Sequence, residues 1–302
     1  MELFQDYLCP TNLQEAVQAL AQAPESTSVI AGGTDLLLDI RQGRHQTVDL
    51  LVDVSEVAEL NEISEQDGWI YLGAAVTHKR IITDPLLIEQ ARCLVEGCGL
   101  IGGPQVRNVA TIGGNVAHAL PAGDGTVGLL ALDSEVQLAS VEGTRWLPLL
   151  EIFAGPGRVT FNRSQELVAG FRFRAQGVGE ASAFYRVMRP QGVAIAILNA
   201  AAWVKIQSEA FVDVRISIGP AGPKPFRGFR TEAFLKGKSL EGDFLPEAVS
   251  ILAEEVSLRT SAHRATKEYR HQLLPVLLQQ VLETAVSRSL GRPYQIEVAK
   301  HD

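Results

Sequence analysis

The protein has 302 residues, which is enough for two domains and a buried core. Its net charge of -8 and its isoelectric point of about 5.4 argue against a nucleic-acid partner, because such partners are bound by a basic face. No apolar run approaches the roughly 18 to 20 residues that cross a bilayer, and the N-terminus lacks the layout of a signal peptide, so we expect a cytoplasmic protein without a membrane span.

The first half of the chain alternates between predicted helices and strands. Apolar residues at helical spacing predict helices over residues 12–20, with Asn12 as the cap, over residues 35–40, with Thr34 as the cap, and over residues 84–98. Short apolar runs predict strands over residues 28–31, 47–54, 69–75, 135–140 and 166–173. This alternation indicates an α/β or α+β architecture.

Regular periodicity is lost between residues 101 and 128, where glycine and proline become dense. A long irregular segment inside a compact domain is usually functional, so we expect binding residues there. Residues 176–179 are a predicted linker. Beyond it we expect a sheet of three antiparallel strands, over residues 183–189, 192–207 and 212–219, and then helices over residues 246–258 and 266–290.

The cysteines do not predict a disulfide framework or a metal centre. Cys93 and Cys98 have the C-x4-C spacing that begins one iron–sulfur pattern, but the two further cysteines that this pattern needs are missing. Cys9 stands far from both. We therefore expect buried or partly buried thiols on a helix, and no metal site in this chain.

Two glycine pairs follow apolar, strand-like runs, in AGGTD (residues 31–35) and TIGGNVAH (residues 111–118). Glycine lets a ligand approach the backbone closely, and backbone N–H groups at a loop or helix N-terminus bind anions without charged side chains. The G-x-G-x-x-G and G-x-x-x-x-G-K-[ST] motifs are both absent. A dinucleotide would therefore have to bind through a different fold.

These segments resemble the FAD-binding segments of the flavoprotein subunit of molybdenum hydroxylases, a family that includes xanthine dehydrogenase and carbon monoxide dehydrogenase. The resemblance rests on VIAGGTDLLL (residues 29–38) and PQVRNVATIGGNVAHALPAGD (residues 104–124), and it continues through residues 51–63, 166–171 and 259–282. It implies an α+β fold. A two-lobed FAD-binding domain of the vanillyl-alcohol oxidase/para-cresol methylhydroxylase type would cover residues 1–176, with lobes of about 1–55 and 56–176. A C-terminal α+β domain, with a three-stranded antiparallel sheet and a helical bundle, would cover residues 177–302.

The resemblance also implies that the FAD pyrophosphate lies between the two glycine loops. The first loop would bind it through Val29, Ile30, Ala31, Gly32, Gly33, Thr34, Asp35 and Leu36. The second loop would hold its opposite side through Thr111, Gly113, Gly114 and Asn115. Because a carboxylate repels phosphate, we expect the backbone N–H of Asp35 to bind while its side chain turns outward or caps the helix.

Further contacts to FAD are implied outside the loops. Asp124 would accept hydrogen bonds from hydroxyls at the adenosine end; without the family context it would be a turn residue. Ile101 either lies against the flavin or packs in the core, and Leu167 or Val168 is expected near the isoalloxazine. Arg186 falls where many relatives have a lysine, and its charge could stabilise reduced, anionic flavin at the flavin edge.

Other polar residues receive no catalytic role. Residues 189–194 lie where relatives often carry an acidic residue near the flavin, and Gly192 and Val193 stand here instead, which leaves the electron acceptor open. No nucleophile is arranged with His118, so we expect a loop histidine that makes a hydrogen bond. His263 and His271 are expected on the surface. We predict no catalytic residue in this chain.

The resemblance implies an FAD-binding electron-transfer subunit. It would take electrons from a 2Fe-2S small subunit, beside a molybdopterin-binding large subunit, and pass them to NAD+ or another acceptor. The expected assembly is a heterotrimer, with dimerisation of that heterotrimer left open. A stand-alone flavin oxidase of the same superfamily and a non-enzymatic scaffold subunit are the alternatives.

Overall fold

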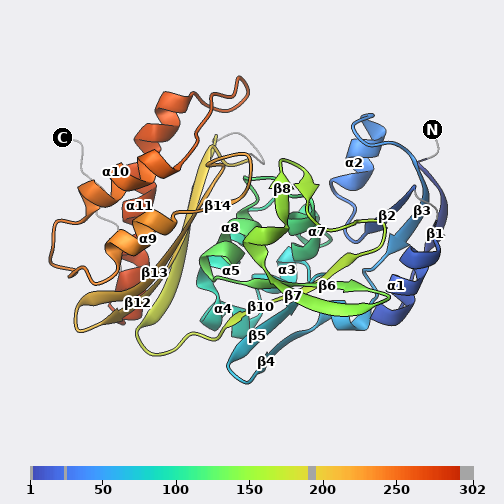
Figure 1. The fold of residues 1–302 in the computed structure, drawn as a ribbon, viewed down its shortest axis with the longest axis horizontal. Helices are drawn as coiled ribbons and strands as arrows, with labels where there is room; N and C mark the ends of the chain where they lie inside the picture. Colours follow the sequence, from blue (N-terminus) through green and yellow to red (C-terminus); the bar gives the residue numbers. More distant parts are fainter. Residues whose placement is uncertain (1–2, 24–25, 190–194, 293–302) are drawn as a thin grey trace.

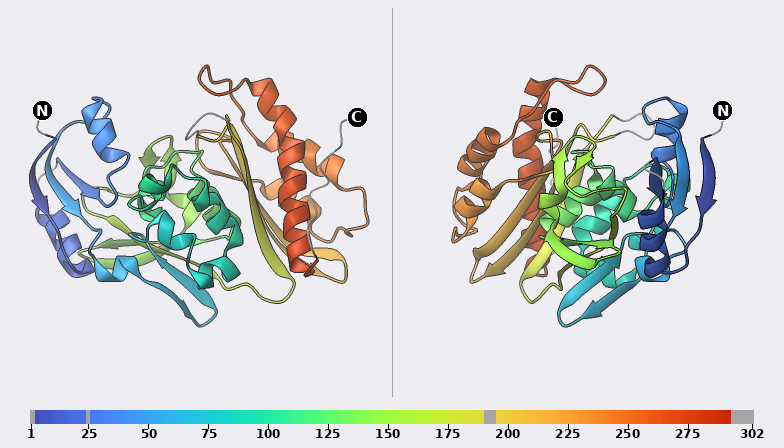
Figure 2. Two further views of the ribbon diagram at one scale, coloured as in Figure 1. Left: turned by 180° about the vertical axis from the view of Figure 1, so that it is seen from behind. Right: turned by 45° about the vertical axis from the view of Figure 1, so that its right-hand side comes forward.

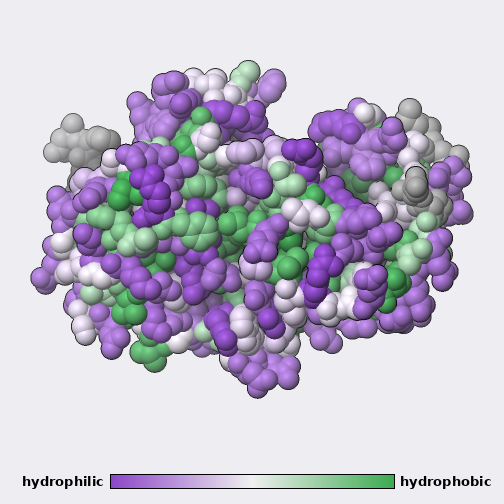
Figure 3. Space-filling view, in the orientation of Figure 1, coloured by the Kyte–Doolittle hydropathy of each residue, from purple (hydrophilic) through white to green (hydrophobic). Residues whose placement is uncertain are grey.

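A computed structural model describes residues 3–23, 26–189 and 195–292. The chain passes through three regions that follow one another along the long axis of the molecule (Figure 1). An N-terminal parallel sheet is followed by a central antiparallel sheet with short helices, and then by a C-terminal sheet covered by longer helices. The upper outline of the molecule is notched between α2 (Leu36–Arg41) and the C-terminal helices (Figure 3).

The N-terminal sheet has the strand order β1 (Phe4–Leu8), β3 (Val48–Asp53), β2 (Thr27–Ile30), and both strand pairs are parallel. Helix α1 (Leu13–Gln22) packs on β3. It begins as predicted, because the Asn12 side chain accepts a hydrogen bond from Glu15 N at 2.9 Å. Helix α2 follows β2 after the first glycine loop, which therefore lies at the carboxyl end of a parallel strand.

The central sheet is antiparallel, in the order β4 (Ile63–Gln66), β5 (Trp69–Gly73), β10 (Leu167–Arg174), β6 (Glu135–Ser140), β7 (Gly143–Pro148). Short elements flank it: η1 (Ala58–Asn61), α3 (His78–Ile81), η2 (Leu149–Ile152), β8 (Phe153–Gly155) and β9 (Arg158–Val159). One core, which includes Phe171 and Phe173 of β10, is shared by the sheet and these helices.

Two predictions in this region are wrong. The single helix expected over residues 84–98 is two helices, α4 (Pro85–Gln90) and α5 (Arg92–Gly99), because Ala91 leaves the helical conformation with φ -145° and ψ 49°. The segment expected to be irregular contains α6 (Pro104–Arg107), α7 (Ile112–Ala117) and α8 (Asp124–Ala131).

Glycines in these short helices permit close packing. A Cβ on Gly113 would lie 2.6 Å from Ala74 O, and a Cβ on Gly128 would lie 2.9 Å from the Cα of Leu94. Local sequence periodicity does not reveal such contacts, because the partners lie far away along the chain. Both glycines therefore allow close packing within helices, in a segment where the sequence predicted an irregular loop.

The C-terminal sheet has four strands, in the order β11 (Glu180–Val187), β12 (Leu198–Gln207), β13 (Ala210–Gly219), β14 (Phe226–Arg227), so the three-stranded prediction is wrong. Strand β14 pairs only two residues with β13, which is too short for a periodic signal. Helix α11 (Lys267–Ser289) lies along β11 and β12 (Figure 2), and α9 (Phe229–Leu235) and α10 (Leu245–Glu255) complete this layer. The predicted start of the second strand falls on residues 192–194, outside the described residues.

Helices α5 and α8 join the central region to the C-terminal sheet, because α5 packs on β11 and α8 packs on β12 and β13. Polar contacts reinforce this junction. Arg288 Nη2 of α11 lies 2.5 Å from Glu96 Oε1 of α5, and Cys93 N donates to Ser182 Oγ at 3.1 Å. The C-terminal sheet is therefore held firmly against the helices that carry the second glycine-rich segment.

Candidate functional site

The first glycine loop lies directly against the segment that precedes the second loop. A Cβ on Gly32 would stand 2.1 Å from Val109 O and 2.8 Å from the Cα of Ala110, so only glycine fits this close backbone approach. Gly33 has a φ of +65°, which other residues adopt rarely. The structure thus brings together two loops that are far apart in the sequence.

The backbone amides of the first loop have no internal partners. From Ala31 to Asp35, no backbone N–H group donates a hydrogen bond to any of the residues described. The first helical bond beyond them runs from Leu37 N to Gly33 O at 3.2 Å. A row of unpaired N–H groups before a helix is suited to an anionic ligand, and this observation fits a pyrophosphate.

Asp35, and not the predicted Thr34, occupies the cap position of α2, but its side chain makes no capping hydrogen bond. The side chain is exposed, and its Oδ2 lies 3.6 Å from Nδ1 of His118. His118 Nε2 lies 3.7 Å from Asp39 Oδ2 of α2. These distances are too long for hydrogen bonds, so the hydrogen bond expected for His118 is not seen among the described residues. Its ring, at the end of α7, lies between two carboxylates at the start of and within α2.

The amides of the second loop are used differently. Thr111 is buried and caps α7, because its Oγ1 accepts from Gly114 N at 3.1 Å. Gly113 N donates to Ala74 O at 2.8 Å, and Asn115 N donates to Thr111 O at 3.0 Å. The two loops are therefore not equivalent, and the free backbone donors belong to the first.

The Asn115 side chain connects α7 to α8. Its Oδ1 accepts from Thr126 N at 3.0 Å and from Thr126 Oγ1 at 3.1 Å. Its Nδ2 donates no hydrogen bond within the part of the chain that the structure covers. Because the carbonyl oxygen is held in this way, the NH2 group remains available to a ligand.

Asp124 and Arg186, predicted as separate contacts to a cofactor, form a buried ion pair. Arg186 Nη1 lies 2.5 Å from Asp124 Oδ2, and the two side chains are only 5% and 6% exposed. Asn199 Nδ2 donates to Asp124 Oδ1 at 2.6 Å. Burial raises the pKa of the Asp124 carboxyl, and attraction by Arg186 and the hydrogen bond from Asn199 oppose that rise.

Sequence reasoning missed Asn199. A polar residue inside the apolar strand LNAAAW was the available signal, because a buried amide needs partners. Two atoms of this group still have none, namely Arg186 Nε and Asn199 Oδ1. The group therefore has unused hydrogen-bonding capacity where β11 and β12 meet α8.

The predicted apolar contacts all belong to the core. Leu167 and Val168 are buried in β10, and Ile101 packs against the same core from its edge. Strand β10, which carries Leu167 and Val168, is connected to the second loop through Ala74, since Ala74 N donates to Ala169 O at 3.1 Å and Ala74 O accepts from Gly113 N. Their contact with a cofactor stays a prediction.

Cys93 and Cys98 agree with the prediction of a helical, buried location, whereas Cys9 is exposed and lies outside the helices. Cys93 and Cys98 lie in α5 and are fully buried, and burial raises the pKa of Cys93 to about 12. Among the described residues, no cluster of three or more histidine, cysteine or acidic side chains could hold a metal ion. None of the helices described is both long and apolar enough to cross a membrane.

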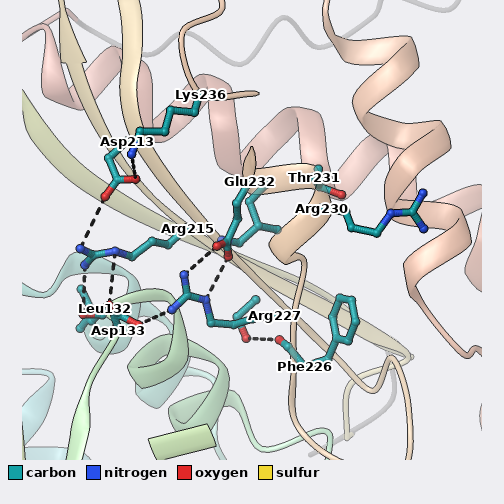
Figure 4. Close-up of polar contacts among 12 residues, drawn as sticks. Leu132, Asp133, Asp213, Arg215, Phe226, Arg227, Arg230, Thr231, Glu232 and Lys236 are labelled. Atoms are coloured by element: carbon teal, nitrogen blue, oxygen red, sulfur yellow. Dashed lines mark hydrogen bonds and ion pairs between the residues drawn. The ribbon is translucent and has the colours of Figure 1, made fainter. Parts of the chain in front are cut away.

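A cavity among the described residues lies elsewhere, at the junction of the central and C-terminal regions. It has a volume of about 450 Å³, and its lining includes Asp133, Arg215 and Arg227. Arg227 pairs with Asp133 and, at 2.7 Å, with Glu232, and Arg215 Nη2 lies 3.7 Å from Asp213 (Figure 4). Since these arginines already have carboxylate partners, we interpret the cluster as a structural contact.

Comparisons with known proteins agree with this geometry. Residues 2–173 match the model of the FAD binding domain in molybdopterin dehydrogenase, and residues 183–285 match the CO dehydrogenase flavoprotein C-terminal domain. The nicotinate dehydrogenase FAD-subunit of Eubacterium barkeri is 31% identical, over 83% of this chain and 86% of that protein. The xanthine dehydrogenase FAD-binding subunit of Escherichia coli O157:H7 is 29% identical, over 96% and 98%. Quinoline 2-oxidoreductase of Pseudomonas putida 86 has a similar structure, with a TM-score of 0.86 and 26% identity, over 95% of this chain and 98% of that one.

The match to the FAD-binding domain over residues 2–173, together with the C-terminal flavoprotein domain, defines a flavin-binding oxidoreductase subunit. More particularly, the chain belongs to the family of FAD-binding subunits of molybdopterin dehydrogenases. Its cofactor is FAD. The resemblance identified in the sequence is therefore confirmed.

Proposed function

We propose that this chain is the electron-transfer subunit of a cytoplasmic molybdenum hydroxylase complex. It takes electrons from a 2Fe-2S small subunit, beside a molybdopterin-binding large subunit, and passes them to NAD+ or another acceptor. The support comes from relatives over nearly the whole chain, which are named as FAD subunits or medium chains of xanthine, nicotinate and carbon monoxide dehydrogenases. When bound, FAD supplies both one-electron and two-electron redox chemistry.

We further propose that the FAD-binding domain covers residues 1–176, in two lobes of about 1–55 and 56–176 and of the vanillyl-alcohol oxidase type, and that residues 177–302 form the second domain. The observation that supports the proposal is the row of unpaired backbone amides from Ala31 to Asp35. Within this row, Gly32 packs closely against the backbone of Val109. These amides lie at the boundary between the two lobes, where they can bind the pyrophosphate.

The other predicted residues have distinct roles in this proposal. Thr111, Gly113 and Gly114 shape the loop that faces the first one, and Asn115 Nδ2 supplies a side-chain donor. Asp124 and Asn199 hold the Arg186 guanidinium in place, and its unpaired Nε remains for the ligand. A cation held there favours added negative charge on a neighbouring group.

Co-purification with the neighbouring subunits tests the electron-transfer function. Molybdenum and 2Fe-2S clusters should travel with the chain, at a fixed ratio to FAD. A purified single chain that holds FAD and turns over a small alcohol would favour the stand-alone oxidase instead. A chain without flavin absorbance at about 450 nm would favour the scaffold.

The amide loop has its own test in the variant Thr34→Pro. Proline removes one N–H donor from the row, whereas Gln46→Pro removes an amide in the exposed loop before β3 and serves as the control. Thr34→Pro should lower FAD affinity by about tenfold or more, as expected for the loss of a charge-assisted hydrogen bond. Equal FAD affinity in both variants would contradict the assigned role of the first loop.

A further inference from the structure

Arg270 is a buried cation to which the described part of the chain offers no ion-pair partner. It is only 2% exposed and is the bulkiest fully buried side chain described. Its Nε has no hydrogen-bond partner, and none of the acidic groups in residues 3–23, 26–189 and 195–292 forms an ion pair with it. A buried charge in this state is costly, and the described residues do not supply the counter-charge that would offset it.

Two further arginines lie close to it. The loop before α11 folds back on the first turn of that helix, since Lys267 N donates to Thr260 Oγ1 at 3.0 Å and Ser261 N donates to Ala265 O at 2.9 Å. This fold brings Arg259 and Arg264 near Arg270. Burial and repulsion by these two arginines lower the pKa of Arg270.

The local charge is opposite to that of the whole protein. Residues 259–271 contain four lysines or arginines, at positions 259, 264, 267 and 270, and one acidic residue, Glu268. The chain as a whole carries a net charge of -8. Arg189 approaches from the end of β11, where its Nη2 donates to Arg264 O at 3.3 Å. Uncompensated positive charge is thus concentrated at the N-terminus of α11, the end of a helix that itself favours anions.

We propose that Arg259, Arg264 and Arg270, the arginine cluster, bind the phosphate group of a small anionic ligand. Three neighbouring arginines suit a multiply charged phosphate, because a guanidinium group can donate two parallel hydrogen bonds to phosphate oxygens. A single carboxylate from a partner protein would leave most of this charge uncompensated. The cluster shares no residue with the free amides of Ala31 to Asp35, so it does not rest on the assignment of those amides to FAD.

The phosphate could come from free inorganic phosphate or pyrophosphate, or from a dinucleotide such as NAD+. Calorimetric titration of the FAD-saturated full-length chain at low salt with each of the three compounds distinguishes these sources. We expect saturable binding of at least one of them. Arg264→Gln should weaken that binding by about tenfold or more, which corresponds to the loss of one charge-assisted contact.

The variants are chosen so that misfolding does not obscure the result. Arg259→Gln and Arg264→Gln change a loop, whereas Arg270→Met removes the buried charge at similar length, and unchanged FAD content shows that each variant is folded. Arg230→Gln, at an exposed arginine paired with Glu254, is the matched control and should bind as the wild type does.

Two outcomes overturn the proposal. One is the absence of binding by phosphate, pyrophosphate and NAD+ alike, which would leave an acidic partner segment as the source of the missing charge. The other is binding that is equally tight in the wild type and in Arg259→Gln, Arg264→Gln and Arg270→Met. A wild-type protein that binds phosphate but does not bind FAD would contradict the proposed function. It would not contradict phosphate binding by the arginine cluster.

Discussion

Removal of the Arg186 charge should destabilise the protein strongly. In Arg186→Met the carboxylate of Asp124 stays buried without its ion-pair partner, since Arg186 Nη1 now lies 2.5 Å away and both side chains are almost fully enclosed. Breaking a buried pair by removing one partner costs about 3–5 kcal/mol. Asn199 Nδ2, at 2.6 Å, offsets only part of this cost.

A second substitution should reverse most of that loss. In the double variant Asp124→Asn/Arg186→Met no charge is buried, and the amide keeps the shape of the carboxyl. We expect the double variant to recover about 2 kcal/mol or more relative to Arg186→Met, because replacing both partners avoids the uncompensated charge. The exposed pair of Arg230 and Glu254 is the control, and Arg230→Met should change stability by at most about 1 kcal/mol.

Stability is measured by urea unfolding at saturating FAD, followed by circular dichroism. The penalty in Arg186→Met should grow with pH. Burial raises the pKa of Asp124 in the folded protein, and the loss of Arg186 raises it further, so the folded state binds more protons and stability falls as pH rises above about 4. An Arg186→Met variant no less stable than Arg230→Met would refute this reasoning, as would a double variant no better than Arg186→Met.

Three further predictions concern the glycine loop, a thiol and a buried histidine. Gly32→Ala should displace the first loop and lower FAD affinity by about tenfold or more, because its Cβ would meet Val109 O at 2.1 Å. With a thiol reagent, only Cys9 should react in the native protein, since the other two cysteines are fully buried. Burial and then Arg107 lower the pKa of His78 to about 4, so the unfolded state binds more protons and stability should fall as pH drops from about 6.5 towards 4.

Each of these has a clear contrary result. Gly222→Ala is the control for Gly32→Ala, because a Cβ at Gly222 meets nothing closer than Lys224 O at 3.9 Å and Gly222 is not among the glycines with positive φ. Equal FAD loss in both variants would exclude the steric explanation. Labelling of all three cysteines before unfolding would contradict the buried thiols. A His78→Gln variant with the same acid sensitivity as the wild type would remove His78 as its cause.

Local sequence patterns predicted most of the secondary structure. The cap at Asn12, the strand Glu135–Ser140 and the long helix α11 appear where spacing and capping chemistry indicated them. These signals depend on neighbouring residues along the chain, so no knowledge of packing was needed. The errors occur where packing overrides local preference, as at Ala91, which separates α4 from α5.

The candidate site was predicted in its parts, but its arrangement was not. AGGTD and TIGGN were predicted to be binding loops from local features, namely glycine and backbone amides, and from the family resemblance. That Asp124 pairs with Arg186, 62 residues later, could not be read from spacing. Nor could spacing show that Arg270 is buried without an ion-pair partner among the described residues, since burial is a property of the folded chain.

By itself, the sequence determined the family, the FAD cofactor and the two loops that the pyrophosphate is proposed to meet. Only the tertiary structure decided that the first loop has free backbone amides, whereas the amides of the second loop donate hydrogen bonds to Ala74 and Thr111. The physical reason is that an amide is available to a ligand only when no carbonyl lies opposite it. Contacts between segments that are distant in the sequence determine which carbonyl lies opposite each amide, as Ala74 O lies opposite Gly113 N.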